Sequence, residues 1–143
     1  MPSVQTSLVI AAPPERVWAV LTDFAAYPQW TAIISKVRTR MHAGAGIRFR
    51  IKIEATPELG FAARIVRCDP RRELAWRGGA PLVPALAWGE HYFRLEQDGD
   101  GTRLTHGEDF GGLLGLIVRG RVHARITRTY DAFNHALKAR AEA

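Results

Sequence analysis

The chain has 143 residues, enough for one domain with its own core, and 47% of them are hydrophobic and 24% charged, as in ordinary globular proteins. A net charge of +6 favours an anionic partner, but the basic residues form no run of five, which argues against nucleic acid. The single cysteine, Cys68, excludes an internal disulfide and favours a reducing compartment, so we expect a cytoplasmic protein with one domain over residues 1–143.

The N-terminal quarter predicts a strand followed by two short helices. Residues 3–11 are rich in strand formers, and neither they nor any other stretch resembles a signal peptide or a transmembrane segment. Tandem prolines suit the start of the next element, a helix whose apolar residues recur at helical spacing: Val17, Val20, Leu21 and Phe24. Pro28 ends this helix, and we expect the second short helical turn over residues 31–37.

The middle of the chain alternates between apolar and polar residues, as antiparallel strands with one wet face do. In residues 46–55 one face carries Ile47, Phe49, Ile51 and Ile53, and the other carries Arg48, Arg50, Lys52 and Glu54. Because Phe49 lies opposite those charges, this strand lacks the basic-aromatic surface that binds single-stranded nucleic acid. Residues 61–69 and 73–79 predict two more strands, and residues 80–87 a proline-marked loop.

After Gly111 and Gly112 the pattern becomes helical to the end of the chain. Apolar residues recur at three- and four-residue steps, which predicts one long amphipathic helix: Val118, Val122, Ile126, Tyr130, Phe133 and Leu137. It is the only element long enough to cover the apolar face of the sheet. We therefore predict an α+β fold, a curved antiparallel sheet of about six to seven strands wrapped around this helix, with a pocket between them.

Three segments of the chain form a recognisable set: AAPPERVWAVLTDFAAYPQW, GEHYFRL with GTRLTHGEDFGG, and the C-terminal FNHALKARAE. Together they resemble the SRPBCC superfamily, also called START-like or Bet v 1-like, in its polyketide cyclase/dehydrase-like branch, and the similarity covers essentially the whole chain. The resemblance implies a helix-grip fold with a hydrophobic cavity for a lipid, polyketide, sterol, hormone-like or aromatic ligand. It implies no single reaction, because cyclases and lipid carriers share the fold.

The segment 89–110 predicts a β-hairpin that brings two histidines and a glutamate together. If Asp98–Gly101 forms the loop, Gln97 pairs with Thr102, and the pairs further along are Leu95 with Leu104, Phe93 with His106, and His91 with Glu108. The alternation then directs His91, Phe93, His106 and Glu108 to the cavity side. The same alternation directs four other side chains to the face in contact with water: Arg94, Glu96, Arg103 and Thr105.

This cluster allows three interpretations. Glu108 and His91 could form an acid–base pair, since a carboxylate beside an imidazole raises its pKa and can hold one tautomer. His91, His106 and Glu108 could bind a metal, but all three project from one sheet without a local chelating motif. They could instead be polar groups that line the pocket and orient a ligand, the interpretation we prefer, and we predict no metal and no cofactor.

The other candidate ligand-binding residues are aromatic or apolar, as cavities are lined mostly by such side chains. They are Trp30, Phe49, Ile51, Trp76, Trp88 and Phe93. We expect Trp18 to anchor the first helix and Cys68 to be a buried, unreactive thiol.

The sequence does not indicate an oligomeric state, because it contains neither a long apolar edge strand nor a heptad seam. Three hypotheses about function follow from the sequence. The first is a protein that binds a hydrophobic or aromatic, lipid- or polyketide-like small molecule in the cavity. The second is a cyclase/dehydratase-type lyase or isomerase in which His91 and Glu108 carry out acid–base chemistry. The third is an interaction module that uses the basic stripe of the long helix, Arg121, Arg125 and Arg128, although a solvated outer face is the usual explanation of such a stripe and the one we prefer.

Overall fold

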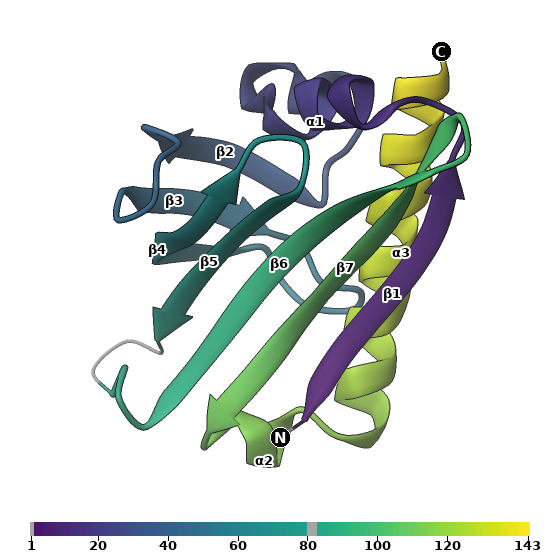
Figure 1. Ribbon diagram of the computed structural model, residues 1–143. Helices are drawn as coiled ribbons and strands as arrows, with labels where there is room; N and C mark the ends of the chain where they lie inside the picture. The colour runs from purple at the N-terminus through teal and green to yellow at the C-terminus, as the bar shows by residue number, and fades with distance from the viewer. Residues whose placement is uncertain (1, 80–82) are drawn as a thin grey trace.

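An antiparallel sheet curls around one long helix in the computed structural model, which describes residues 2–79 and 83–143 (Figure 1). Seven strands occur in this part of the chain, in the order β1-β7-β6-β5-β4-β3-β2. Their bounds are β1 Ser3–Ile10, β2 Ile34–Thr39, β3 Gly46–Ile51, β4 Leu59–Asp69, β5 Glu73–Gly79, β6 Ala87–Asp98 and β7 Gly101–Gly112. The helices are α1 Pro14–Thr22, the 3-10 helix η1 Phe24–Gln29, α2 Leu114–Ile117 and α3 Gly120–Glu142. The predicted helix-grip fold is confirmed.

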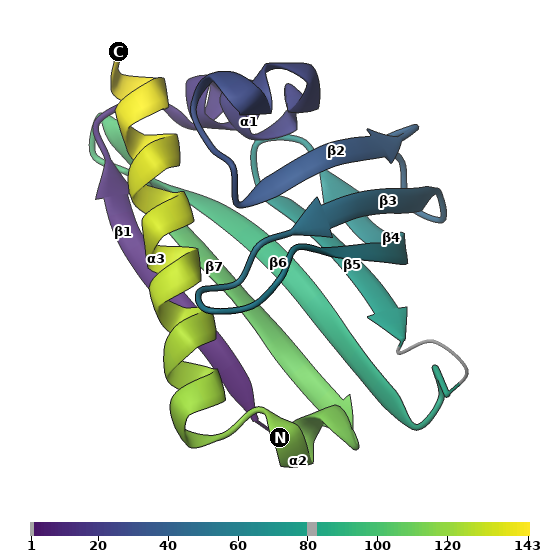
Figure 2. The ribbon, with the colours of Figure 1, turned by 180° about the vertical axis from the view of Figure 1, so that it is seen from behind.

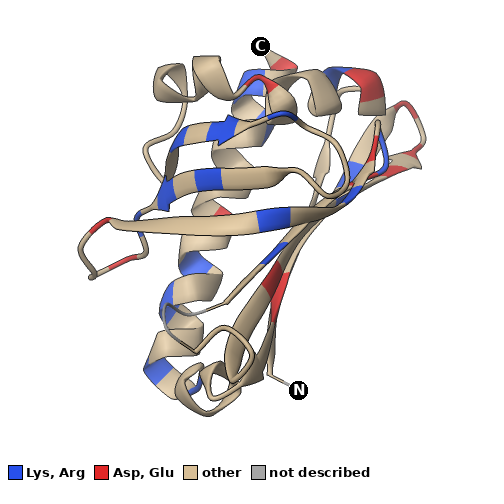
Figure 3. Cartoon of the chain, turned by 90° about the vertical axis from the view of Figure 1, so that its left-hand side faces the viewer, with Lys and Arg blue, Asp and Glu red and all other residues tan. Residues whose placement is uncertain are grey.

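The sheet has one buried and one wet face, as its alternating sequence predicts. In β3 the side chains of Ile47, Phe49 and Ile51 are buried, whereas Arg48 on the opposite face is exposed. Figure 3 shows basic residues along the strands at the end of the sheet formed by β2, β3 and β4. Because the inner face is apolar, it needs a cover, and α3 supplies it across the sheet (Figure 2).

The core lies where α3 meets the sheet and the two N-terminal helices. Phe133 and Leu137 of α3 are fully buried, as are Val17 and Leu21 of α1 and Leu104 of β7. The apolar face predicted for the long helix is therefore the face that packs against the sheet and the N-terminal helices.

The long helix is interrupted, whereas the periodicity predicted one continuous helix after Gly112. The chain forms the short α2, leaves helical geometry at Val118 and Arg119, and begins α3 at Gly120. Gly120 has a φ of +50°, which glycine adopts without the steric cost of a side chain. This break redirects the chain from the end of the sheet back along its inner face.

The second short helix lies earlier than residues 31–37, so that prediction is wrong. It is η1, in which the backbone amides of Trp30 and Thr31 donate to the Tyr27 carbonyl. The buried Tyr27 side chain anchors η1 to α1, because its Oη donates to the carbonyl of Leu21 at 2.5 Å. The chain is extended again from Ile34, where β2 pairs with β3.

The predicted loop over residues 80–87 lies partly outside the described residues, because residues 80–82 are not among them. Val83 to Leu86 form a turn, in which the Leu86 amide donates to the Val83 carbonyl. Across the described residues, no helix combines the length and the apolar character needed to cross a bilayer.

Candidate functional site

The hairpin formed by β6 and β7 has the register that its sequence predicts. Gln97 pairs with Thr102, Leu95 with Leu104, Phe93 with His106, and His91 with Glu108. The inward and outward faces are also as predicted, since His91, Phe93 and His106 are buried while Glu96 and Arg103 are exposed. The register therefore places the two histidines and Glu108 on the inner face of the sheet.

A cavity of about 340 Å³ lies between this face and the segment α2–α3. Small residues create the space, because Ala63 of β4, Gly78 of β5 and Gly89 of β6 lie side by side across three strands. Larger apolar side chains surround it: Phe49, Ile51, Ile53, Phe61, Trp76, Phe110, Leu114, Ile117, Val118, Val122 and Ile126. The ionisable side chains among its described lining residues are His91, Glu108 and Tyr130.

These three side chains meet at one wall of the cavity. Tyr130 of α3 donates its hydroxyl proton to Glu108 Oε1 at 2.5 Å, and its Oη lies 3.3 Å from His91 Nδ1. His91 Nδ1 is 3.4 Å from the same carboxylate oxygen. The His91 ring also stacks against Trp76, with 4.8 Å between centroids. The cavity therefore combines an apolar body with one compact polar end.

A chain of buried hydrogen bonds behind this wall sets the protonation pattern of His91. Thr6 Oγ1 donates to the His106 carbonyl at 2.8 Å, so it accepts from Asn134 Nδ2 at 2.7 Å. Asn134 Oδ1 then accepts from His106 Nδ1 at 2.7 Å. The remaining nitrogen of neutral His106, Nε2, must accept from His91 Nε2, 2.7 Å away. Neutral His91 is therefore protonated on Nε2, and its Nδ1 lone pair faces Glu108.

Burial keeps two members of the cluster uncharged. Burial, and next the proximity of His91, hold the pKa of His106 well below the usual value for histidine. Burial, and next the Glu108 carboxylate, raise the pKa of Tyr130 well above its usual value. Because His106 and Tyr130 stay neutral, the polar end of the cavity presents the His91 Nδ1 atom beside the Glu108 carboxyl group, 3.4 Å apart. A pair of this kind has the geometry needed for proton transfer at the cavity wall.

Gly89 makes room for the carboxylate. A Cβ atom at this position would lie 2.2 Å from Glu108 Oε2, far inside van der Waals contact. Because Gly89 is on β6 beside the cavity, its missing side chain is what lets Glu108 approach Tyr130 and His91.

Of the predicted ligand-binding residues, five line the cavity: Phe49, Ile51, Trp76, His91 and Glu108. Phe93 and His106 lie behind its wall, with their rings stacked at a centroid distance of 4.3 Å. They support the lining residues and do not reach the cavity, because Phe133 and Tyr130 of α3 pack over them.

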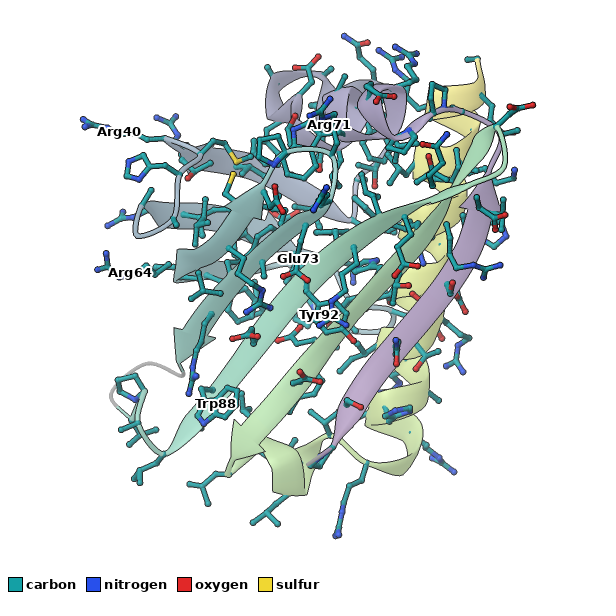
Figure 4. The ribbon with its side chains drawn as sticks, in the orientation of Figure 1. Arg40, Arg64, Arg71, Glu73, Trp88 and Tyr92 are labelled. Atoms are coloured by element: carbon teal, nitrogen blue, oxygen red, sulfur yellow. The ribbon has the colours of Figure 1, made fainter. Side chains whose placement is uncertain are left out.

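Two tryptophans lie away from the cavity, so their predicted positions need correction. Trp30 packs against Tyr27 and Phe133 and borders a separate cleft of about 330 Å³ between α1 and the end of α3. Trp88 is on the outer face of β6 (Figure 4), where the Arg77 guanidinium lies 3.8 Å from its ring centroid. The strand alternation puts Trp88 on the face opposite His91.

The sequence interpretation missed Gly89 and Asn134 and assigned Tyr130 only a packing role. Asn134 was detectable in principle, because it is a polar residue on the otherwise apolar face of the long helix, beside Phe133 and Leu137. A polar side chain at such a position needs a buried partner.

The surroundings of the other candidate residues bear on metal binding, on the thiol and on the basic stripe. His91 Nε2 and His106 Nε2 are hydrogen-bonded to each other, which occupies the two nitrogens that a shared metal ion would need. The described residues contain no group of three or more His, Cys, Asp or Glu side chains that could hold a metal. Burial, and next Asp69, raise the pKa of the half-buried Cys68 thiol, which lowers its reactivity. In the basic stripe, Arg128 forms a bidentate pair with Glu54.

Solved structures with this fold include proteins of several kinds. The aromatase/cyclase Zhui from Streptomyces sp. R1128 is 23% identical, with a TM-score of 0.75 over 99% of this chain and 93% of that one. The hypothetical protein jhp0584 from Helicobacter pylori is 14% identical, with a TM-score of 0.78 over 98% and 88%. Ara h 8.0201 is 11% identical, with a TM-score of 0.71 over 98% of this chain and 97% of that one.

No curated protein matches the chain. The family described as "Polyketide cyclase / dehydrase and lipid transport" matches residues 1–142, which is nearly the whole chain. That match supports a ligand-binding or cyclase role in general. It also agrees with the fold, the cavity and the SRPBCC-like segments of the sequence. The chain belongs to the polyketide cyclase/dehydrase and lipid transport family, within the SRPBCC superfamily.

Proposed function

We propose that this protein binds a hydrophobic or aromatic small molecule, lipid- or polyketide-like, with one polar end. The observation that carries the proposal is the cavity itself, apolar over most of its lining and polar where His91, Glu108 and Tyr130 meet. Its volume of about 340 Å³ is within the range of small-molecule sites. The apolar part would accept the ligand body, and Glu108 or His91 would bond its polar end.

Native mass spectrometry of freshly purified protein, followed by denaturing extraction, tests this proposal. We expect a stoichiometric extra mass that is lost on denaturation. In an Ala63→Phe variant the added ring enters the cavity beside Gly78, so the extra mass should disappear while the fold persists. Val66→Phe, on the same strand with an exposed side chain, is the matched control and should retain the ligand. Equal retention by both variants would contradict binding in this cavity.

One observation favours a second candidate, a cyclase/dehydratase-type lyase or isomerase. The His91 Nδ1 lone pair and the Glu108 carboxylate are 3.4 Å apart at the cavity wall, where a ligand can reach both. In this reading His91 removes a proton from an activated carbon acid, and Glu108 orients the imidazole and stabilises its charged form. Zhui, an aromatase/cyclase of the same fold, is consistent with this candidate.

Glu108→Gln separates the two candidates, because it keeps the shape of the side chain and removes its negative charge. In an enzyme, turnover of the extracted ligand should fall by roughly 100-fold or more. In a carrier, affinity should weaken only about tenfold, the loss of one charge-assisted hydrogen bond. Ligand affinity by calorimetry and product formation by mass spectrometry provide the two readouts. Unchanged values for both would remove Glu108 from the site.

A further inference from the structure

Exposed apolar side chains gather around the mouth of the cavity. Leu113, Leu116 and Ile117 on and beside α2 are each more than half exposed, and Leu86 is 57% exposed. The Leu113 amide donates to the Leu86 carbonyl, which joins α2 to the turn before β6. Figure 1 shows α2 and the starts of β6 and α3 at the same end of the molecule. We call this surface the apolar rim: Phe61, Leu86, Leu113, Leu116, Ile117 and Val122.

Contiguous apolar surfaces of this kind mark an interaction site, because soluble proteins seldom expose them without a partner. Apart from Phe61, the rim offers aliphatic side chains, and the segment from Leu113 to Val118 has no polar side chain at all. Protein–protein interfaces instead enrich aromatic residues, methionine and arginine and carry regular hydrogen bonds between the partners. The rim therefore fits a hydrocarbon partner better than a folded protein.

The charges on the segments that carry Leu86, α2 and the start of α3 are all positive. Between Asp109 and Asp131 the only charged residues are Arg119, Arg121, Arg125 and Arg128, and residues 78–89 contain none. Figure 3 shows the corresponding lower part of α3 with basic positions and no acidic ones. In the described part of the chain Arg119, Arg121 and Arg125 form no ion pair, whereas Arg128 is held by Glu54. Three arginines thus flank the rim without an ion-pair partner among the described residues, and of these only Arg125 lies near enough to Glu54 to interact with its charge.

We propose that the rim docks on an anionic lipid bilayer. The side chains of α2 would enter the boundary between headgroups and acyl chains, and Arg119, Arg121 and Arg125 would contact lipid phosphates and carboxylates. Docking in this orientation puts the cavity mouth against the bilayer, so an apolar molecule could pass between them without crossing water. The rim shares Phe61, Ile117 and Val122 with the lining of the cavity but lies apart from the polar wall of His91, Glu108 and Tyr130. Docking is measurable whether or not the cavity binds a ligand.

Co-sedimentation with vesicles tests the proposal. The probes are vesicles of phosphatidylcholine alone and of an equal mixture of phosphatidylcholine and phosphatidylserine. We expect the protein to bind the mixed vesicles more strongly and to lose binding as salt rises. The variant R119E/R121E should weaken binding to mixed vesicles roughly tenfold or more. The variant L116S/I117S should weaken it as well, with an unchanged circular dichroism spectrum because both side chains are exposed.

Matched controls separate rim docking from general electrostatic attraction. R38E/R40E changes the net charge equally at the opposite end of the molecule, where Arg40 is located in Figure 4. V9S/V66S removes two other exposed apolar side chains. Both controls should bind mixed vesicles as the unmodified protein does.

Equal losses of vesicle binding in R38E/R40E and R119E/R121E would overturn the proposal. So would an absence of vesicle binding, which would leave an acidic protein as the partner of the rim. Ala63→Phe should still bind vesicles, so failure of docking and failure of the proposed ligand binding are distinguishable.

Discussion

Replacing Phe133 with alanine is expected to lower the free energy of unfolding by about 3–5 kcal/mol. The Phe133 side chain is fully buried on α3. Its ring centroid is 5.3 Å from that of Trp30, 5.6 Å from that of Phe93 and 5.4 Å from that of His106. Truncation would therefore leave a void between the helix, the sheet and η1, where four elements now meet.

Chemical denaturation monitored by circular dichroism measures this loss. Phe61→Ala is the matched control, because the same atoms are removed from a side chain that is 44% exposed at the cavity edge. We expect it to cost about 1 kcal/mol or less. If the two variants lose the same stability, Phe133 is not the packing centre that its contacts indicate.

Replacing Asn134 with leucine is expected to lower stability by about 1–3 kcal/mol and to reverse the tautomers of both buried histidines. Leucine has a similar size but offers no acceptor, so the Nδ1–H of His106 would lose its partner 2.7 Å away. The stability loss is the cost of burying that donor unpaired. His106 escapes part of it by moving its proton to Nε2, and His91 Nε2 must then become the acceptor. His91 would consequently present Nδ1–H to Glu108.

Nitrogen-15 chemical shifts of the imidazole rings report these tautomers directly. In the unmodified protein we expect the Nδ1–H form of His106 and the Nε2–H form of His91. Asn134→Asp retains an acceptor for His106 Nδ1, so it should preserve the tautomers even where it alters stability. Unchanged tautomers in Asn134→Leu would show that Asn134 does not control the proton at the cavity wall.

The strand pattern, the hairpin and the overall architecture were predictable because they depend on short-range rules. Alternation assigns each side chain to a face, and a short loop sets which residues of β6 and β7 pair. The same alternation puts Trp88 on the outer face with Glu90 and Arg94, so aromatic character by itself is a poor guide to which side chains line the cavity. The pairing of His91 with Glu108 was predictable for the same local reason.

What the sequence by itself determined is the strand pattern, the apolar faces and the family, but neither the position of η1 nor the break between α2 and α3. The tertiary structure alone decided which groups act on the histidines, because Tyr130 and Asn134 reach them from a helix that lies 39 and 28 residues away along the chain. The crossing of α3 over the sheet selects those contacts, and periodicity carries no information about the rotation of a helix against a particular strand. The same holds for the cavity, which exists because Ala63, Gly78 and Gly89 come together from three strands beneath the helix.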